Sequence, residues 1–242
     1  MIAVRVISLR GSPRRAGMSA QLAAIPGLDW QFVDAAEAVP TDLPHDEEAT
    51  LQTIRRSLTR GELGCFASHF GIWRRLAAMP AASTMVVLED DLLLDPVFFT
   101  NLEAIAVSIP DIPYLRLHAK APAPANVVGR VAGRHLVRYR GMAFGTQAYL
   151  LRQPAAARLV ASITRIVRPI DDELDRYWAH RVVSMGVFPF PVLELGGPST
   201  IEGERRGLAP ATWREPRYQA RRAVESLRRR IANLRLALGL PL

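Results

Sequence analysis

The chain has 242 residues, 49% of them hydrophobic and 22% charged, and its net charge is +8. This length is sufficient for a full hydrophobic core, and the composition excludes a collagen-like, a disulfide-stabilised and a wholly disordered protein. Cys65 is the single cysteine, so no intramolecular disulfide can form, and a reducing compartment fits. Apolar stretches end well short of the ~20 residues that cross a bilayer, and Arg5 interrupts the first of them, which is unlike a signal peptide.

The first segments of the chain alternate between strand-like and helix-like patterns. Val4–Leu9 is a short β-branched run that predicts a buried strand. Ser12 then predicts the N-cap of a helix that extends to about Ile25. Trp30–Val33 predicts a second strand, so the chain opens with a βαβ unit. Residues 34–60 are polar and contain proline, and we expect a loop with little regular structure there.

The middle of the chain carries the clearest patterns. Apolar residues spaced three or four apart predict a helix over Gly61–Met79. Thr84–Leu88 predicts a buried strand, which is followed directly by three acidic residues. Asp95 predicts the N-cap of a helix to about Val107.

The remaining elements follow at regular intervals. Residues 120–135 are rich in alanine, proline and glycine and predict a mobile loop. The other predictions are strands at Tyr114–His118 and Gly145–Arg152, helices at Pro154–Ile166 and Asp171–His180, and an extended segment at Gly186–Leu195. This alternation favours an α/β sheet covered by helices.

The three acids after the predicted strand are Glu89, Asp90 and Asp91. Residues two apart in a strand point the same way, so Glu89 and Asp91 could share one divalent ion, and Asp90 would face elsewhere or bind a sugar or ribose hydroxyl. Oxygen ligands suit Mg²⁺ or Mn²⁺, which take substrate phosphates as further ligands. The alternative is a solvated turn whose acids favour the positive end of the next helix.

Several segments, in their order along residues 4 to about 203, resemble the family 25 glycosyltransferases. This family includes bacterial lipopolysaccharide and lipooligosaccharide β-galactosyltransferases, and the collagen galactosyltransferases are relatives. The matching segments are Val6–Leu9 with Ser12 and Arg14-Arg15, Glu62–His69, Val87–Asp91, Thr146–Leu151, Pro169–Asp175, Phe188–Pro191 and Pro198–Ile201.

The resemblance implies a GT-A-type (Rossmann-like) nucleotide-sugar-binding fold over residues 1–203. It also implies a UDP-sugar donor, UDP-galactose in known bacterial members, with Mn²⁺ or Mg²⁺ as cofactor. The sugar would be transferred with inversion to a saccharide acceptor of lipopolysaccharide or another cell-surface glycan. The alternative function is a non-catalytic carbohydrate- or membrane-surface-binding protein on a degenerate transferase fold.

The candidate catalytic and metal-binding residues are acidic. Glu89 and Asp91 would hold the metal, which would stabilise the leaving diphosphate as a Lewis acid. Inversion requires a base for the acceptor hydroxyl on the opposite face, and Asp171 and Asp172 are the candidates. Their alternative role is N-capping of the following helix.

The candidate substrate-binding residues come from several segments, and several of them have an ordinary structural alternative. The arginines could be solvated surface, the histidine could make a structural hydrogen bond, and the acceptor-binding candidates could belong to a half-buried sheet. The donor-binding candidates are Leu9, Arg10, Arg14, Arg15, Ser68, His69, Asp90, Ser199 and Thr200. The acceptor-binding candidates are Thr146 and Gln147.

Residues 204–242 form a basic tail with ten arginines and three glutamates, so +7 of the total charge of +8 lies there. Its apolar residues are spaced three or four apart and predict an amphipathic helix: Val224, Leu227, Ile231, Leu234 and Leu238. Such a helix suits an anionic membrane surface. The alternatives are packing on the body or on a second subunit, as in a homodimer, and non-specific nucleic-acid binding; no specific nucleic acid is expected. We therefore expect a cytoplasmic protein, peripheral on the inner face of the cytoplasmic membrane.

Overall fold

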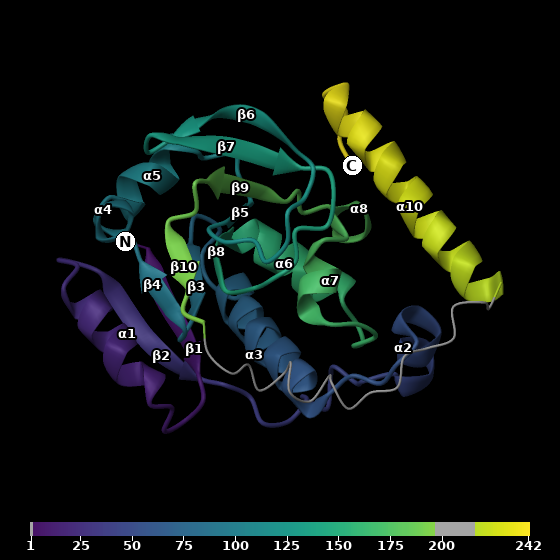
Figure 1. The fold of residues 1–242 in the computed structure, drawn as a ribbon, viewed down its shortest axis with the longest axis horizontal. Helices are drawn as coiled ribbons and strands as arrows, with labels where there is room; N and C mark the ends of the chain where they lie inside the picture. The colour runs from purple at the N-terminus through teal and green to yellow at the C-terminus, as the bar shows by residue number, and fades with distance from the viewer. Residues whose placement is uncertain (1, 197–215) are drawn as a thin grey trace.

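The computed structural model describes residues 2–196 and 216–242. Its centre is a mixed sheet of eight strands in the order β2-β1-β3-β8-β5-β9-β7-β6 (Figure 1). The strands of this sheet are β1 (Ala3–Ser8), β2 (Asp29–Asp34), β3 (Thr84–Glu89), β5 (Tyr114–Arg116), β6 (Ala125–Val131), β7 (Arg134–Tyr139), β8 (Ala148–Arg152) and β9 (Met185–Phe188). A separate antiparallel pair joins β4 (Leu92–Leu94) to β10 (Val192–Glu194).

One parallel unit of the sheet consists of β2, β1 and β3, and β5 and β9 form a further parallel pair. Val6 of β1 pairs with Phe32 on one side and with Leu88 on the other. Side chains of β1 alternate between two core layers, with Val4 and Val6 in one and Ala3 and Ile7 in the other. Both faces of this strand are therefore buried, which is the usual state of parallel sheets in α/β proteins.

Helices cover both faces of the sheet. The first core layer contains buried residues of α1 (Arg14–Ala23), α4 (Pro96–Thr100) and α5 (Leu102–Ser108). The second contains those of α3 (Arg60–Ala77), α6 (Gln153–Ser162) and α7 (Ile170–Leu174). In α3, Thr59 and Glu62 form a capping box, and the predicted stripe buries Phe66, Phe70 and Trp73. The α/β architecture expected from the sequence is confirmed.

The C-terminal helix α10 (Pro216–Ala237) confirms the helix predicted for the tail. It lies along one side of the molecule, beside α2 (Glu47–Ile54) and α8 (Tyr177–His180) (Figure 1). None of the helices within the described ranges is both long and apolar enough to span a bilayer.

Two predicted loops are wrong. Residues 34–60 contain α2, whose first turn is capped by Asp46, which accepts a hydrogen bond from the Ala49 amide at 2.9 Å. The predicted loop at 120–135 contains β6 and begins β7, which form a hairpin around Ala132 and Gly133, both with positive φ. The edge strand β6 is largely exposed and its register shifts between Val127 and Gly129, so it lacks the alternation that marks a strand in sequence.

Three further boundaries differ from the predictions. Helix α1 begins at Arg14 with Pro13, not Ser12, as its N-cap; the Ser12 hydroxyl donates to Asp90 at 2.8 Å and accepts the Arg14 amide at 3.3 Å. The helix expected from Asp95 to Val107 is divided at Asn101 into α4 and α5. The helix expected over Asp171–His180 is likewise divided into α7 and α8.

Candidate active site

The acidic segment leaves β3 at the carboxyl edge of the parallel strands, which is where open α/β sheets bind ligands. β3 ends at Glu89, and the chain bends at Asp90 and Asp91 before β4 begins. The two-residue alternation of a strand therefore does not extend to Asp91, and the three acids face different neighbours.

Asp90 fixes the loop between β1 and α1. Its Oδ2 accepts hydrogen bonds from the hydroxyls of Ser8, at 2.6 Å, and Ser12, at 2.8 Å. Arg14 Nη1 lies 3.6 Å from its other oxygen. These contacts connect Asp90 to the segment that was predicted to bind the donor.

Within the described ranges, only one of the two carboxylate oxygens of Asp91 has a charged neighbour. Its Oδ2 lies 3.3 Å from Arg14 Nη1, but its Oδ1 is buried and has no hydrogen-bond partner among the described residues. Burial, followed by the negative charge of Glu89, raises the pKa of Asp91 to about 6. A buried carboxylate oxygen without a partner is costly, and a bound cation would remove that cost.

Glu89 faces α3 and the start of β8. Its Oε1 accepts a hydrogen bond from Thr146 Oγ1 at 2.9 Å and lies 3.7 Å from His69 Nε2. Burial raises the pKa of Glu89, but His69 and the Thr146 hydroxyl outweigh it, so the pKa lies below its usual value. His69 is fully buried; its Nδ1 is 2.8 Å from the Tyr149 hydroxyl, and its Nε2 has no hydrogen-bond partner among the described residues.

Cys65, His69 and Glu89 each place one candidate ligand atom within 4.8 Å of the other two. Glu89 belongs to this cluster, and its negative charge also raises the pKa of Asp91. The oxygen-rich side, with the unpartnered oxygen of Asp91, fits Mg²⁺ or Mn²⁺ by its donor chemistry.

The two candidate bases lie in the first turn of α7. Asp171 accepts hydrogen bonds from the amides of Gly145, at 3.3 Å, and Asp172, at 3.0 Å. Burial, and then the charge of Asp171, raise the pKa of Asp172 to about 6. Neither acid is the N-cap, since α7 begins at Ile170 after Pro169 and has no side-chain cap. Gly145 and Thr146 are adjacent, so one short segment connects Asp171 to Glu89.

The other donor-binding candidates in the described residues make structural contacts. Arg15 donates to the Ser8 hydroxyl at 3.1 Å and to its carbonyl at 3.0 Å, and Arg10 pairs with Asp34 at the surface at 2.8 Å. Leu9 is exposed beside them. Ser199 and Thr200 lie outside the described residues.

Two further candidates also lie at packing contacts. The Ser68 hydroxyl accepts from the Ala36 amide at 2.8 Å and donates to the Gly64 carbonyl at 2.6 Å. It thereby attaches the segment after β2 to α3. Gln147 accepts the Glu89 amide on its carbonyl at 2.8 Å, and its side chain lies 3.4 Å from His118.

Comparison with known proteins identifies the family. The model of "Glycosyltransferase family 25 (LPS biosynthesis protein)" matches residues 1–174. The chain belongs to glycosyltransferase family 25. In this family member, the parallel β2-β1-β3 unit carries acids at its carboxyl edge, as the α/β fold expected from the sequence would place them.

Individual relatives share limited identity with this family 25 chain. It is 27% identical over 181 residues to the human inactive glycosyltransferase 25 family member 3, covering 66% of this chain and 29% of that protein. It is 26% identical over 148 residues to procollagen galactosyltransferase 1 of Danio rerio, covering 58% of this chain and 24% of that protein. The chain thus spans less than a third of these relatives. A solved glycosyltransferase involved in the glycosylation of the major capsid of PBCV-1 has 15% identity and a TM-score of 0.35, over 64% of this chain and 61% of that chain.

The sequence did not predict a buried ion pair that contacts the backbone of Phe144 and Gly145, next to Thr146. Arg116 Nη2 lies 2.8 Å from Asp175 Oδ1, and both side chains are buried. Arg116 also donates to the carbonyls of Phe144, at 2.9 Å, and Gly145, at 2.5 Å, while Asp175 accepts the Phe144 amide at 2.7 Å. The pair thereby fixes the segment that presents Thr146. An arginine within the apolar run Tyr114–His118 is the signal that could have revealed it.

Proposed function

We propose that this chain transfers a sugar, galactose from UDP-galactose, to a saccharide acceptor of lipopolysaccharide or another cell-surface glycan, with inversion and with Mn²⁺ or Mg²⁺. Family membership supports a glycosyltransferase. The observation that carries the metal-dependent form of the proposal is the buried Oδ1 of Asp91, which has no hydrogen-bond partner among the described residues and lies at the carboxyl edge of the sheet.

In this proposal, Asp91 and Glu89 hold the metal. When bound, the ion supplies Lewis-acid stabilisation of the leaving diphosphate. Arg14 lies 3.3 Å from Asp91 and 3.6 Å from Asp90, so its guanidinium is placed to share that charge. Asp90 holds the β1–α1 loop closed through Ser8 and Ser12, and this fixes the backbone on which the donor would rest.

Asp172 is our candidate for the base that removes the proton from the acceptor hydroxyl. Both oxygens of Asp171 accept backbone amides, whereas Asp172 lines an open cleft. A pKa of about 6 leaves the Asp172 carboxylate largely ionised at neutral pH, yet more basic than an ordinary aspartate. Thr146 and Gln147, which follow Gly145 towards β8, would contact the acceptor.

Release of UDP tests this function directly. The purified chain is incubated with UDP-galactose and Mn²⁺, and free UDP is measured with and without saccharide acceptors. We expect Asp91→Asn to lower the rate at least about a hundredfold. Asp111→Asn, the same change at an exposed aspartate away from the site, should leave it unchanged. Full activity of D91N, or of the wild type in excess chelator, would remove the metal from the mechanism.

The second candidate function is saccharide binding without catalysis. The human relative is named an inactive glycosyltransferase 25 family member, and this observation favours it. Two measurements distinguish the functions. A binding protein would be stabilised by a saccharide. It would release no UDP from any nucleotide sugar in a panel tested with Mn²⁺.

We also propose that α10 places the protein on the inner face of the cytoplasmic membrane. Its contacts with the body are mostly polar: Glu225 with Arg176, and Asn233 with Tyr177 at 2.8 Å. The apolar stripe is exposed instead, with Leu227 at 57% and Leu234 at 62% exposure. Exposed arginines flank the stripe, and this combination suits an anionic lipid surface.

A further inference from the structure

A cleft of about 850 Å³ lies between α10 and the segment that contains α7 and α8. It is lined by arginines from both sides, together with Asp172, Glu225 and a few aromatic side chains. The base candidate Asp172 therefore opens into this cleft. The charges of the arginines that line the cleft, called the arginine wall below, indicate which ligand it can bind.

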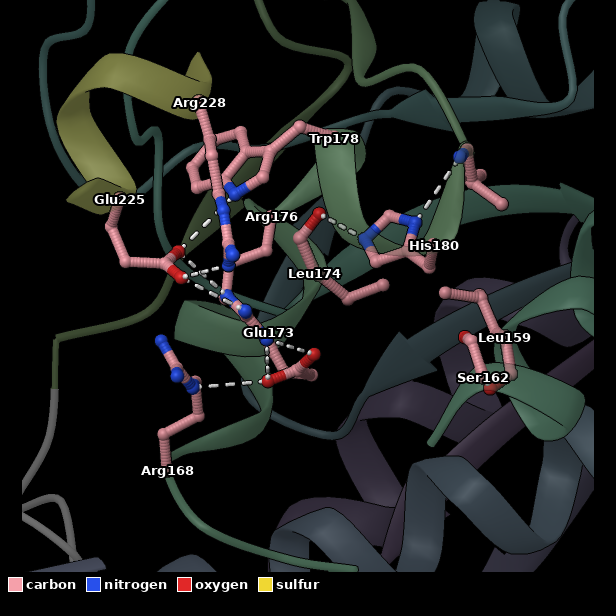
Figure 2. Close-up of polar contacts among 11 residues, drawn as sticks. Leu159, Ser162, Arg168, Glu173, Leu174, Arg176, Trp178, His180, Glu225 and Arg228 are labelled. Atoms are coloured by element: carbon pink, nitrogen blue, oxygen red, sulfur yellow. Dashed lines mark hydrogen bonds and ion pairs between the residues drawn. The ribbon is translucent and has the colours of Figure 1, made fainter. Parts of the chain in front are cut away.

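Part of this arginine wall is neutralised by acids. Figure 2 shows Arg176 between Glu173, at 2.9 Å, and Glu225, at 3.1 Å. Arg168 lies 3.1 Å from Glu173, and Arg228 lies 3.5 Å from Glu225 (Figure 2). Two glutamates thus hold three arginines in place. A fourth lining residue, Arg56, forms two hydrogen bonds of 2.7 Å with the buried carboxylate of Glu62.

Three further arginines of the wall have no acidic partner among the described residues. Arg221 donates to the amide oxygen of Gln52 at 2.7 Å, and Arg222 lies over the Tyr218 ring with 5.8 Å to its centroid. Arg229 is half-buried and also lines the cleft. All three come from α10, so this helix brings uncompensated positive charge to a concave surface. Such a surface attracts anions, because the surrounding low-dielectric walls concentrate its field.

The cleft also has the features of a sugar-binding surface. Trp178, Phe144 and Tyr218 contribute aromatic faces to the lining. The Trp178 indole N–H donates to Glu225 at 3.2 Å, which fixes the orientation of its ring. Aromatic rings give apolar contact area, whereas guanidinium groups bind phosphate or carboxylate groups through paired hydrogen bonds.

We propose that this cleft binds an acidic saccharide, with its phosphate or carboxylate groups on Arg222 and Arg229 and its sugar rings beside Asp172. The inference rests on the proposed function, since it makes this saccharide the acceptor. It deepens that function by assigning negative charge to the acceptor. The donor diphosphate is assigned to a different place, the carboxyl edge of β1 and β3 near Arg14.

Binding is measured by calorimetry without donor or turnover. The probe is a fully deacylated lipooligosaccharide, which cannot enter a membrane, in three forms: intact, dephosphorylated and carboxyl-reduced. We expect the intact form to bind and R222Q/R229Q to bind it about tenfold or more weakly. The matched control is R230Q/R235Q, which removes the same charge from exposed positions of α10 outside the cleft and should retain full affinity.

The modified probes identify the anionic group. Loss of affinity on dephosphorylation assigns phosphate, and loss on carboxyl reduction assigns carboxylate. Equal binding of all three forms, equal weakening in both double variants, or no binding of the intact form would each overturn the inference. Because no UDP release is involved, a chain that binds the intact probe through Arg222 and Arg229 but never releases UDP would retain this site and lose only the proposed function.

Discussion

The hydroxyl of Thr146 donates a hydrogen bond of 2.9 Å to Oε1 of Glu89. These residues are 57 positions apart, one ahead of β8 and one at the end of β3, and the contact joins a predicted acceptor residue to a predicted metal ligand. The bond holds one oxygen of Glu89 and lowers its pKa. A side chain fixed in this way is pre-organised for binding.

Thr146→Val tests this contact. The substitution keeps the shape and removes the donor, so Oε1 of Glu89 loses its hydrogen bond. We expect UDP release to fall about tenfold and the free energy of unfolding to fall by about 1 kcal/mol. Thr146→Ser, which keeps the hydroxyl, should restore most of the activity. If the serine variant were as impaired as the valine variant, the threonine methyl group and not the hydrogen bond would be responsible.

Asp91 is expected to favour function at the expense of stability. Its pKa of about 6 in the folded chain, against 3.8 ordinarily, means that the folded state holds the proton more tightly. The contribution of Asp91 to the free energy of unfolding therefore falls as pH rises from about 4 to 6, by up to roughly 3 kcal/mol.

Asp91→Asn should consequently unfold at higher urea concentration than the wild type at pH 7.5 in the presence of chelator. The difference should become small near pH 4, where Asp91 in the folded chain is protonated and neutral like the asparagine. Urea titrations at the two pH values measure this. A variant less stable than the wild type at pH 7.5 would show that Arg14 already compensates the carboxylate.

The buried pair Arg116–Asp175 predicts a large loss of stability. Asp175→Asn keeps an acceptor for the Phe144 amide but leaves the Arg116 guanidinium buried without a counter-charge. We expect the free energy of unfolding to fall by about 3–5 kcal/mol. The matched control is Asp42→Asn, which breaks the exposed pair with Arg74 and should cost less than about 1 kcal/mol. Similar losses in both variants would contradict this reading of the pair.

The exposed stripe of α10 predicts binding to anionic vesicles. Leu227→Ser together with Ile231→Ser should weaken co-sedimentation with vesicles of phosphatidylglycerol and phosphatidylcholine at least about tenfold. Val97→Ser with Val107→Ser removes exposed apolar side chains elsewhere and serves as the control. Neutral vesicles should bind the wild type less well. A wild type that ignores both kinds of vesicle, and elutes as a dimer dissociated by the α10 variant, would assign the stripe to a second subunit.

Local patterns in the sequence determined the strands β1, β2 and β3, the apolar stripe of α3, the acidic segment after β3 and the amphipathic character of α10. Periodicity and abrupt changes from apolar to acidic residues are properties of neighbouring positions, so they can be read without a fold. The hairpin of β6 and β7 was not predicted, because the exposed edge strand β6 has no alternation of apolar and polar residues.

Only the tertiary structure decided how these elements use their side chains. After the bend at Asp90 and Asp91 the three acids have different partners: Glu89 accepts from Thr146, Asp90 accepts from Ser8, and Asp91 keeps an oxygen without a partner among the described residues. The Arg116–Asp175 pair joins residues 59 positions apart. Which face of α10 meets the body depends on polar contacts such as Glu225 with Arg176, whose partners lie far apart in the chain. Such contacts depend on the packing of distant segments, and no local pattern encodes them.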